Sequence, residues 1–519
     1  MKKRERRLTA LLITMVLFMC GCGQSNTDST STPESSTAVE VAEKKDCINV
    51  AVNRDITSLD GSGGGFTSTT ASQHIFDSLV RLNEKMEPEP ALATEWEMVD
   101  DLTWKFKLRE GVTFHDKSVF DAESVAFSIK HYTEAIKYKY STQWREAWPP
   151  SCEVVDQYTV LIKTQSPQPA VPRLLSRLPM LPVDYAGMSV EDFYGSPIGT
   201  GAFKFEKWDQ GICLTLAANE DYWRCTPAVK TINYYTVTDD NARMAGFKSG
   251  EYDIVYAVPY DQVESINQTE GLKVLAKETI GYDAIQYNFN VRENSPVADL
   301  KIRQAMLYAI DHAGICEIIM SGYQKPAQGP APMNVFGSYD GGGFPERDLE
   351  KAKQLMEEAG YNGGEIVFAF HSGEFTSDLE VSELVLAQLQ EAGFNITFTQ
   401  VESGAWTDMK MTDQWDITNN SVPGSFSGEA QYHYNQMKNL TGLYLEEFEA
   451  IMDEADLDTQ QSEEERAADI SNAMKVLWDY TPYVFATVPT SSIGMIENLT
   501  GYEYIPLNWL MLSEAGYSE

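Results

Sequence analysis

The stretch EIVFAFHSGEFTSDLEVSELVLAQLQEAGFNITFTQV, residues 365–401, decides the fold class of this chain. Its first part, residues 365–370, is a short apolar run typical of a buried strand, and residues 395–401 form a second one. A helix is predicted between them, over residues 377–392. Strands that alternate with helices predict a parallel sheet in an α/β lobe.

The segments on either side continue this pattern. A Pro/Gly-rich loop over residues 322–345 interrupts it. Nearer the N-terminus, residues 47–52 predict a buried strand, and the strict alternation of residues 104–109 predicts a half-exposed one. Asp121 is suited to cap the helix that follows. Further helices are predicted over residues 299–319, 348–360, 443–455 and 463–479, and further strands over 483–488 and 492–496.

Length and charge limit what the protein can be. A chain of 519 residues is too long for one core and predicts two to four lobes. Asp and Glu number 77 against 40 Lys and Arg, which gives a net charge of -37. Such a charge argues against binding of nucleic acid and against a polybasic membrane surface.

The N-terminus predicts export and anchoring. Five basic residues between positions 2 and 7 precede an apolar run over residues 8–19, which is too short to span a bilayer comfortably. Gly21-Cys22 resembles a bacterial lipobox, so residues 1–22 are expected to be a lipoprotein signal peptide and Cys22 the lipidated residue, carrying palmitate or a similar chain. Residues 23–46 are expected to be a flexible tether to the extracytoplasmic face of the cell membrane. The alternative is a cleaved signal peptide that releases a secreted protein.

The remaining five cysteines predict neither a disulfide framework nor a metal site. An odd number without CxxC spacing supports neither a set of disulfides nor a zinc site. Cys213 and Cys225 are close enough in the sequence to meet across a hairpin, which sequence alone does not decide.

The stretch DITNNSVPGSFSGEAQYHY, residues 416–434, is the candidate ligand wall. A predicted strand ends within residues 416–418, and the Gly, Pro and polar residues that follow are poor core material. The stretch is therefore expected at the carboxyl edge of the sheet, where open α/β sheets place ligands; an ordinary surface loop is the alternative. A second ligand contact is expected from the glycine-rich turn at residues 59–68, which fails the dinucleotide fingerprint because Phe66 stands at the third glycine. The candidate ligand-binding residues are Phe66, Thr67, Asn420, Ser421, Phe426, Glu429, Tyr432 and His433.

A family resemblance covers most of the chain. Residues 90–129, PALATEWEMVDDLTWKFKLREGVTFHDKSVFDAESVAFSI, resemble the signature of the large solute-binding proteins, family 5, of bacterial ABC importers for oligopeptides, dipeptides and nickel complexes. Lys117 replaces a usual glycine, and Ala202 a usual proline. The resemblance extends from about residue 48 to 505, and its further motifs lie at residues 197–211, 219–223, 250–254, 302–311 and 352–361.

The resemblance implies a fold. It is a mixed α/β fold of the type II (cluster C) periplasmic-binding-protein kind, with two main lobes, a hinge and an extra inserted subdomain. The implied lobes are a discontinuous lobe I of residues 47–83, 197–290 and 485–519, an inserted lobe II of 84–196, and an α/β lobe III of 291–484.

The resemblance also implies a function. The protein is expected to capture a solute, most simply a short peptide, between closing lobes and to deliver it to an ABC permease with its ATPase subunits. It is expected to be a monomer without catalytic residues, metal or cofactor. The alternatives are a nickel or metallophore complex as ligand, a peptide-signal receptor, and a surface hydrolase. The hydrolase has little support, since Phe426 stands where a nucleophile elbow needs serine.

The ligand-reading stretch is where this chain departs from the family. In peptide-binding relatives an Asp in the part that corresponds to residues 424–431 meets the peptide amino group, and this chain offers only Glu429 there. In dipeptide binders an Arg near the position of Glu374 can meet the carboxylate, and Glu374 has the opposite charge. Nickel-complex binders use a His in the same stretch, for which His433 is the candidate.

Overall fold

The computed structural model describes residues 45–61, 65–134, 148–290, 292, 294–410, 412–422, 424 and 427–518, without the side chains of residues 65–67, 403, 404 and 407. The predicted signal peptide, almost all of the predicted tether, and Cys22 lie outside the described residues. The same holds for Phe426 and for the side chains of Phe66 and Thr67.

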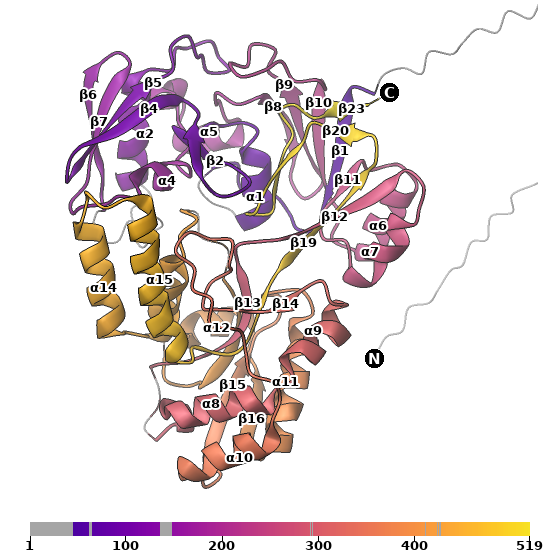
Figure 1. Cartoon of the computed structure of the whole chain (residues 1–519). Helices are drawn as coiled ribbons and strands as arrows, with labels where there is room; N and C mark the ends of the chain where they lie inside the picture. The colour runs from indigo at the N-terminus through magenta and orange to yellow at the C-terminus, as the bar shows by residue number, and fades with distance from the viewer. Residues whose placement is uncertain are drawn as a thin grey trace, which may run out of the picture. The chain divides into compact units, whose positions relative to one another are not determined.

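A seven-stranded sheet organises the first part of the described chain (Figure 1). Its central strand β1 (Cys47–Val52) pairs in parallel with β10 (Thr231–Thr236) and β11 (Ile254–Val255), which confirms the buried strand predicted over residues 47–52. The sheet order is β12-β19-β11-β1-β10-β9-β8. The other members are β8 (Phe203–Asp209), β9 (Cys213–Ala218), β12 (Leu272–Glu278) and β19 (Thr490–Ile496), and the helices α6 (Asp240–Lys248) and α7 (Tyr260–Asn267) connect the strands from β10 to β12.

A separate four-stranded antiparallel sheet lies within residues 93–163. It has the order β4-β5-β7-β6, and helix α2 (Ala122–Glu134) packs against β6 and β7. The predicted helix start is confirmed, because Asp121 Oδ1 accepts the N–H of Glu123 at 3.1 Å. The strands of this sheet are β4 (Ala93–Asp100), β5 (Thr103–Leu108), β6 (Ser151–Asp156) and β7 (Thr159–Lys163). This part of the chain also contains the hairpin of β2 (Val80–Leu82) and β3 (Pro88–Pro90) and the helices α1 (Gly65–Ser72), α4 (Val171–Leu175) and α5 (Val190–Gly195).

The third large sheet is six-stranded and mixed. Its order is β14-β18-β13-β17-β15-β16, where β15, β16 and β17 are parallel and β13 is antiparallel to both neighbours. The sequence-based expectation of a parallel sheet therefore holds for only part of it, because β13 enters directly from β12 without a crossover helix. The strands are β13 (Tyr282–Tyr287), β14 (Lys325–Pro326), β15 (Glu365–Phe370), β16 (Asn395–Gln400), β17 (Ile417–Val422) and β18 (Tyr483–Val488).

Helices cover both faces of this sheet, and each face has its own apolar core. The helix predicted over residues 299–319 is two helices, because Ile310 is extended and Asp311 caps the second one by accepting the N–H of Gly314 at 2.9 Å. The helices are α8 (Leu300–Ala309), α9 (His312–Met320), α10 (Leu349–Glu358), α11 (Asp378–Ala392), α12 (Ser403–Met409), α13 (Gln431–Thr441), α14 (Glu446–Leu457) and α15 (Glu463–Asp479).

The chain passes between the seven-stranded and six-stranded sheets at two places, residues 279–281 and residue 489. The two crossings touch, since the N–H of Thr279 donates to the carbonyl of Pro489 at 2.9 Å. We call residues 45–278 and 490–518 the first half, and residues 282–488 the second half. Strand pairing thus places β13 and β18 in the second half, although the expected boundaries assign all of β13 and most of β18 to lobe I. No helix among the described residues is long and apolar enough to cross a membrane.

Candidate functional site

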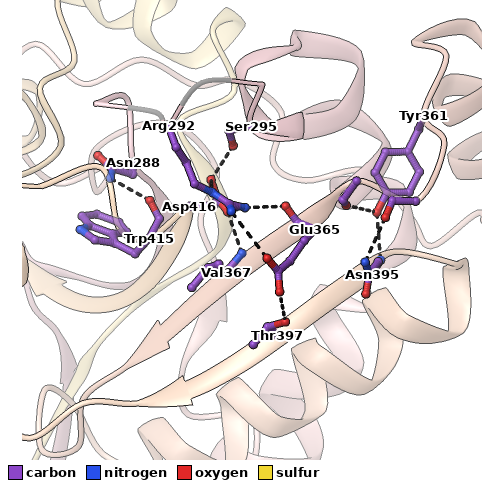
Figure 2. Close-up of polar contacts among 12 residues, drawn as sticks. Asn288, Arg292, Ser295, Tyr361, Glu365, Val367, Asn395, Thr397, Trp415 and Asp416 are labelled. Carbon is purple, nitrogen blue, oxygen red and sulfur yellow. Dashed lines mark hydrogen bonds and ion pairs between the residues drawn. The ribbon is translucent and has the colours of Figure 1, made fainter.

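Asp416 lies at the opposite end of β17 from the one the sequence predicted. The strand begins after Asp416 and runs on to Val422, so Asp416 is at its amino end. There the carboxylate accepts from Arg292 Nη2 at 2.7 Å, from the N–H of Val367 at 2.7 Å, and from the Ser295 hydroxyl (Figure 2). The prediction that the strand ends at residues 416–418 is therefore wrong, because the polar residues 418–421 continue the pairing with β13.

The carboxyl end of β17 still carries part of the predicted wall. Ser421 and Asn420 point to opposite faces of the sheet, as successive strand residues must. The Ser421 hydroxyl donates to Asp283 Oδ1 at 2.8 Å, whereas Asn420 Nδ2 reaches Gln286 Oε1 at 3.4 Å on the other face. Residues 424 and 427–430 then follow beyond the end of the strand.

Asp283 is the buried acid of this region. It is 4% exposed and accepts from Ser421 and, at 3.3 Å, from Gln324 Nε2. The Thr487 hydroxyl donates to Gln324 Oε1 at 2.6 Å and so fixes that amide. Burial raises the pKa of Asp283 to about 7. The negative charges of Asp378 and Glu374 also raise this pKa, whereas the two hydrogen bonds lower it.

A loop after β15 brings further polar groups to the same edge. The His371 Nδ1 atom lies 3.2 Å from Glu374 Oε1. Burial alone would raise the pKa of Glu374, but His371, the N–H of Ser421 and the charge of Arg54 lower it below its usual value. Asp378 Oδ2 holds the loop by accepting the N–H groups of Gly373 and Glu374 at 2.7 and 3.0 Å.

Arg54 joins this edge from the first half. It lies two residues after the end of β1, and its Nη2 donates to the carbonyl of Gly373 at 3.4 Å. The carboxyl ends of β1 and β15 therefore face each other from the two sheets. Carboxyl ends of strands are where open α/β sheets place ligands.

Glu429 is engaged by protein groups. Its carboxylate forms an ion pair with Arg466 of α15, with Oε2 3.3 Å from Nη2, and it also accepts from Gln431 Nε2 at 2.5 Å. The Glu429 and Arg466 side chains are 2% and 7% exposed. Burial alone would lower the pKa of Arg466, and the charges of Glu429 and Asp456 reverse this and raise it. The arrangement fits a structural support for residues 428–430.

Tyr432 and His433 lie on α13 and are buried. The His433 ring packs against the ring of Tyr282 at 5.2 Å between centroids. Burial lowers its pKa to about 4, so the imidazole is neutral at pH 7. In the part of the chain that the structure describes, no group of three or more His, Cys, Asp or Glu side chains could hold a metal ion.

Two further observations concern cysteines and a cavity in the first half. Cys213 and Cys225 are both free thiols, so the hairpin disulfide left open by the sequence is not formed. A cavity of about 80 Å³ in the first half is lined in part by Asp77, Tyr222 and Trp223. Asp77 accepts from the Tyr222 hydroxyl at 3.0 Å and from Trp223 Nε1 at 2.9 Å, as expected for packing anchors.

The structure therefore brings together a different set of residues from the predicted one. Of the candidates, Asn420 and Ser421 lie at the carboxyl end of β17, while Glu429, Tyr432 and His433 are buried further along the chain. Asp283 had a usable signal in the sequence, because it is the single acid of the strand YDAIQY, which is buried at every position. Arg54 and His371 carried no such signal, since only the fold places them here.

Comparison with known proteins fits this architecture. The family model "Bacterial extracellular solute-binding proteins, family 5 Middle" matches residues 87–442. Among curated proteins, the glutathione-binding protein GsiB of Pectobacterium atrosepticum is 25% identical over 92% of this chain and 95% of its own length. The oligopeptide-binding protein AppA of Bacillus subtilis is 25% identical over 98% of this chain and 97% of its own.

A solved structure extends the likeness to the fold. The periplasmic binding protein DppA from Helicobacter pylori, in complex with the peptide STSA, aligns with a TM-score of 0.77 at 22% identity and covers 92% of this chain and 99% of its own. The mixed α/β architecture is thus that of the type II periplasmic binding proteins. Because the family model covers well over half of the chain, the protein belongs to the bacterial extracellular solute-binding proteins of family 5.

Proposed function

We propose that the protein is the extracytoplasmic substrate-binding component of an ABC importer and that its solute is a short peptide. The observation that carries the proposal is the meeting of Arg54 with Gly373, which sets the carboxyl ends of β1 and β15 face to face. A solute held there has partners on both halves. Along the described part of the chain, the backbone passes from one sheet to the other at the two touching crossings, residues 279–281 and 489, so they are the natural hinge. Solute contacts from both sides would then stabilise the closed state.

A peptide is favoured over other solutes for two reasons. The oligopeptide-binding AppA and the peptide-bound DppA are among the relatives of this chain. In addition, β17 ends at this edge of the sheet, and a strand end suits pairing with an extended peptide, a mode of binding that tolerates varied side chains. Within this proposal Ser421, Asn420 and the predicted contacts Phe66, Thr67 and Phe426 face the solute, while Glu429, Tyr432 and His433 support the wall from behind.

The finer assignments belong to the same proposal. Residues 1–22 direct export, Cys22 carries the lipid that anchors the protein to the cell membrane, and the folded part acts as a monomer beside the permease. The polar groups at the carboxyl edge bind and do not catalyse.

Calorimetry on the full-length chain, extracted from membranes in detergent, tests the proposal. Di-, tri- and tetrapeptides should bind without being cleaved, and Ser421→Ala should weaken that binding several-fold. Ser265→Ala is the matched control, since Ser265 lies exposed on α7 of the first half and should leave affinity unchanged. Binding of nickel-histidine but of no peptide would overturn the choice of solute, and peptide cleavage would overturn the binding role.

A further inference from the structure

Phe336 lies beside two cationic groups that come from different halves. It belongs to the segment between β14 and α10 in the second half. The guanidinium carbon of Arg173, on α4 in the first half, lies 4.7 Å from the centre of its ring. The guanidinium carbon of Arg466, on α15 in the second half, lies 5.7 Å from the same ring. Phe336 is thus the aromatic partner of one cation from each half.

The backbone of Phe336 is bound to the segment that follows β17. Its N–H donates to the carbonyl of Gly428 at 2.8 Å, and its carbonyl accepts the N–H of Ala430 at 2.9 Å. The residue between them, Glu429, is paired with Arg466. Any movement of residues 428–430 therefore moves Phe336 as well.

Arg173 is fixed in the first half by burial and by a hydrogen bond. It is 6% exposed, and its Nη1 donates to the carbonyl of Met86 at 2.6 Å. Met86 forms the tip of the β2–β3 hairpin and is buried among apolar residues of the second half. A side chain at Gly428 would meet Met86, with Cβ to Cβ at 3.1 Å. The contact between the halves is close and largely dry, which strengthens a cation–π interaction.

We propose that Arg173 and Phe336 form a closing latch, which joins the two halves next to residues 428–430 and ties these residues to the closed state. Opening about the crossings separates Arg173 from the ring, while Arg466 stays with it. The latch rests on the proposed closure of the two halves but not on the identity of the solute. It connects residues 428–430, which lie within the candidate ligand wall, directly to α4.

Single-molecule fluorescence energy transfer on the full-length chain tests the latch. Dyes carried by non-natural amino acids at Val99 and Leu457, which are 48% and 65% exposed in the two halves, flank the contact between Asp101 and Thr459 and report opening. The wild-type chain should show an open and a closed population without solute. A cation–π contact of about 0.5–2 kcal/mol corresponds to a closed-to-open ratio that falls about 2- to 30-fold in Arg173→Met and in Phe336→Leu. The double variant should fall no further than the larger single effect, because both changes remove one contact.

Arg109→Met is the matched control. Arg109 also lies over an aromatic ring, at 4.5 Å from that of Trp223, and donates to a backbone carbonyl, that of Ala91 at 3.0 Å. All three residues belong to the first half, so the closed-to-open ratio should not change. An unchanged ratio in both latch variants, or an equal fall in the control, would overturn the latch.

The same labelled wild-type chain separates the latch from the proposed function. A tryptic digest of casein should increase the closed population. If the digest has no effect while the latch variants lower the ratio, peptide binding fails and the latch stands. If the wild type shows a single population under both conditions, the proposed closure fails, and the latch fails with it.

Discussion

Replacing Glu429 by alanine tests the assignment of this residue to the protein framework. The Arg466 side chain is 7% exposed, and after the change Asp456 at 3.6 Å and the Phe336 ring remain beside its guanidinium. Breaking a buried ion pair by removing one partner costs about 3–5 kcal/mol, because a charge stays buried without its counter-ion. We expect the free energy of unfolding to fall by about 3 kcal/mol, at the lower end because Asp456 remains. Glu429→Gln should lose less, since its amide oxygen can still accept from Arg466.

Urea unfolding at pH 7, followed by circular dichroism, measures this loss. The matched control is Asp479→Ala, which breaks an ion pair of α15 whose Lys475 and Asp479 side chains are 53% and 58% exposed. Exposed pairs of this kind contribute about 0–1 kcal/mol. If Glu429→Ala costs no more than this control and instead abolishes solute binding, then Glu429 faces the solute and its structural assignment here is wrong.

Three further changes test other parts of the structure. Burial raises the pKa of Asp283 to about 7, so on acidification the folded protein binds a proton at this carboxyl at a higher pH than the unfolded chain does. Between pH 8 and 5.5 the free energy of unfolding of the wild type should therefore rise by about 2 kcal/mol relative to that of Asp283→Asn. A difference between the two proteins that does not depend on pH would contradict this. Gly428→Ala should lower the melting temperature more than Gly342→Ala. Both glycines have a positive φ, +70° at Gly428 and +76° at Gly342, but only the methyl added at position 428 meets a neighbour, Met86. Asp416→Ala should cost about 3 kcal/mol in urea unfolding, because the N–H of Val367 and the hydroxyl of the buried Ser295 lose their acceptor, and a loss below 1 kcal/mol would show that this cluster is dispensable.

Elements fixed by local signals were predictable from the sequence. Strands over residues 365–370 and 483–488 and the helix over 463–479 agree with the structure at both ends. The helix begins where Ser462 and Glu465 cap each other reciprocally, which is a purely local device. The family motifs supplied the fold class for the same reason, because they are contiguous segments.

The candidate site was less predictable because its pairings are distant in the sequence. Asp416 was expected near the ligand, yet Arg292 and Ser295 fix it at the far end of the strand. Glu429 was the only acid within residues 424–431, and its partner Arg466 lies on the distant helix α15. No pattern within the stretch 416–434 indicates either partner, since both are brought there by strand order and helix packing.

Native mass spectrometry of the full-length chain, purified from its own cells without added solute, tests most directly whether the protein binds short peptides. If the protein binds short peptides, we expect mass additions that fragment into short peptides and that disappear after partial unfolding and dialysis. Additions that contain nickel, or a chain that stays free of solute and does not bind casein peptides when they are supplied, would contradict it.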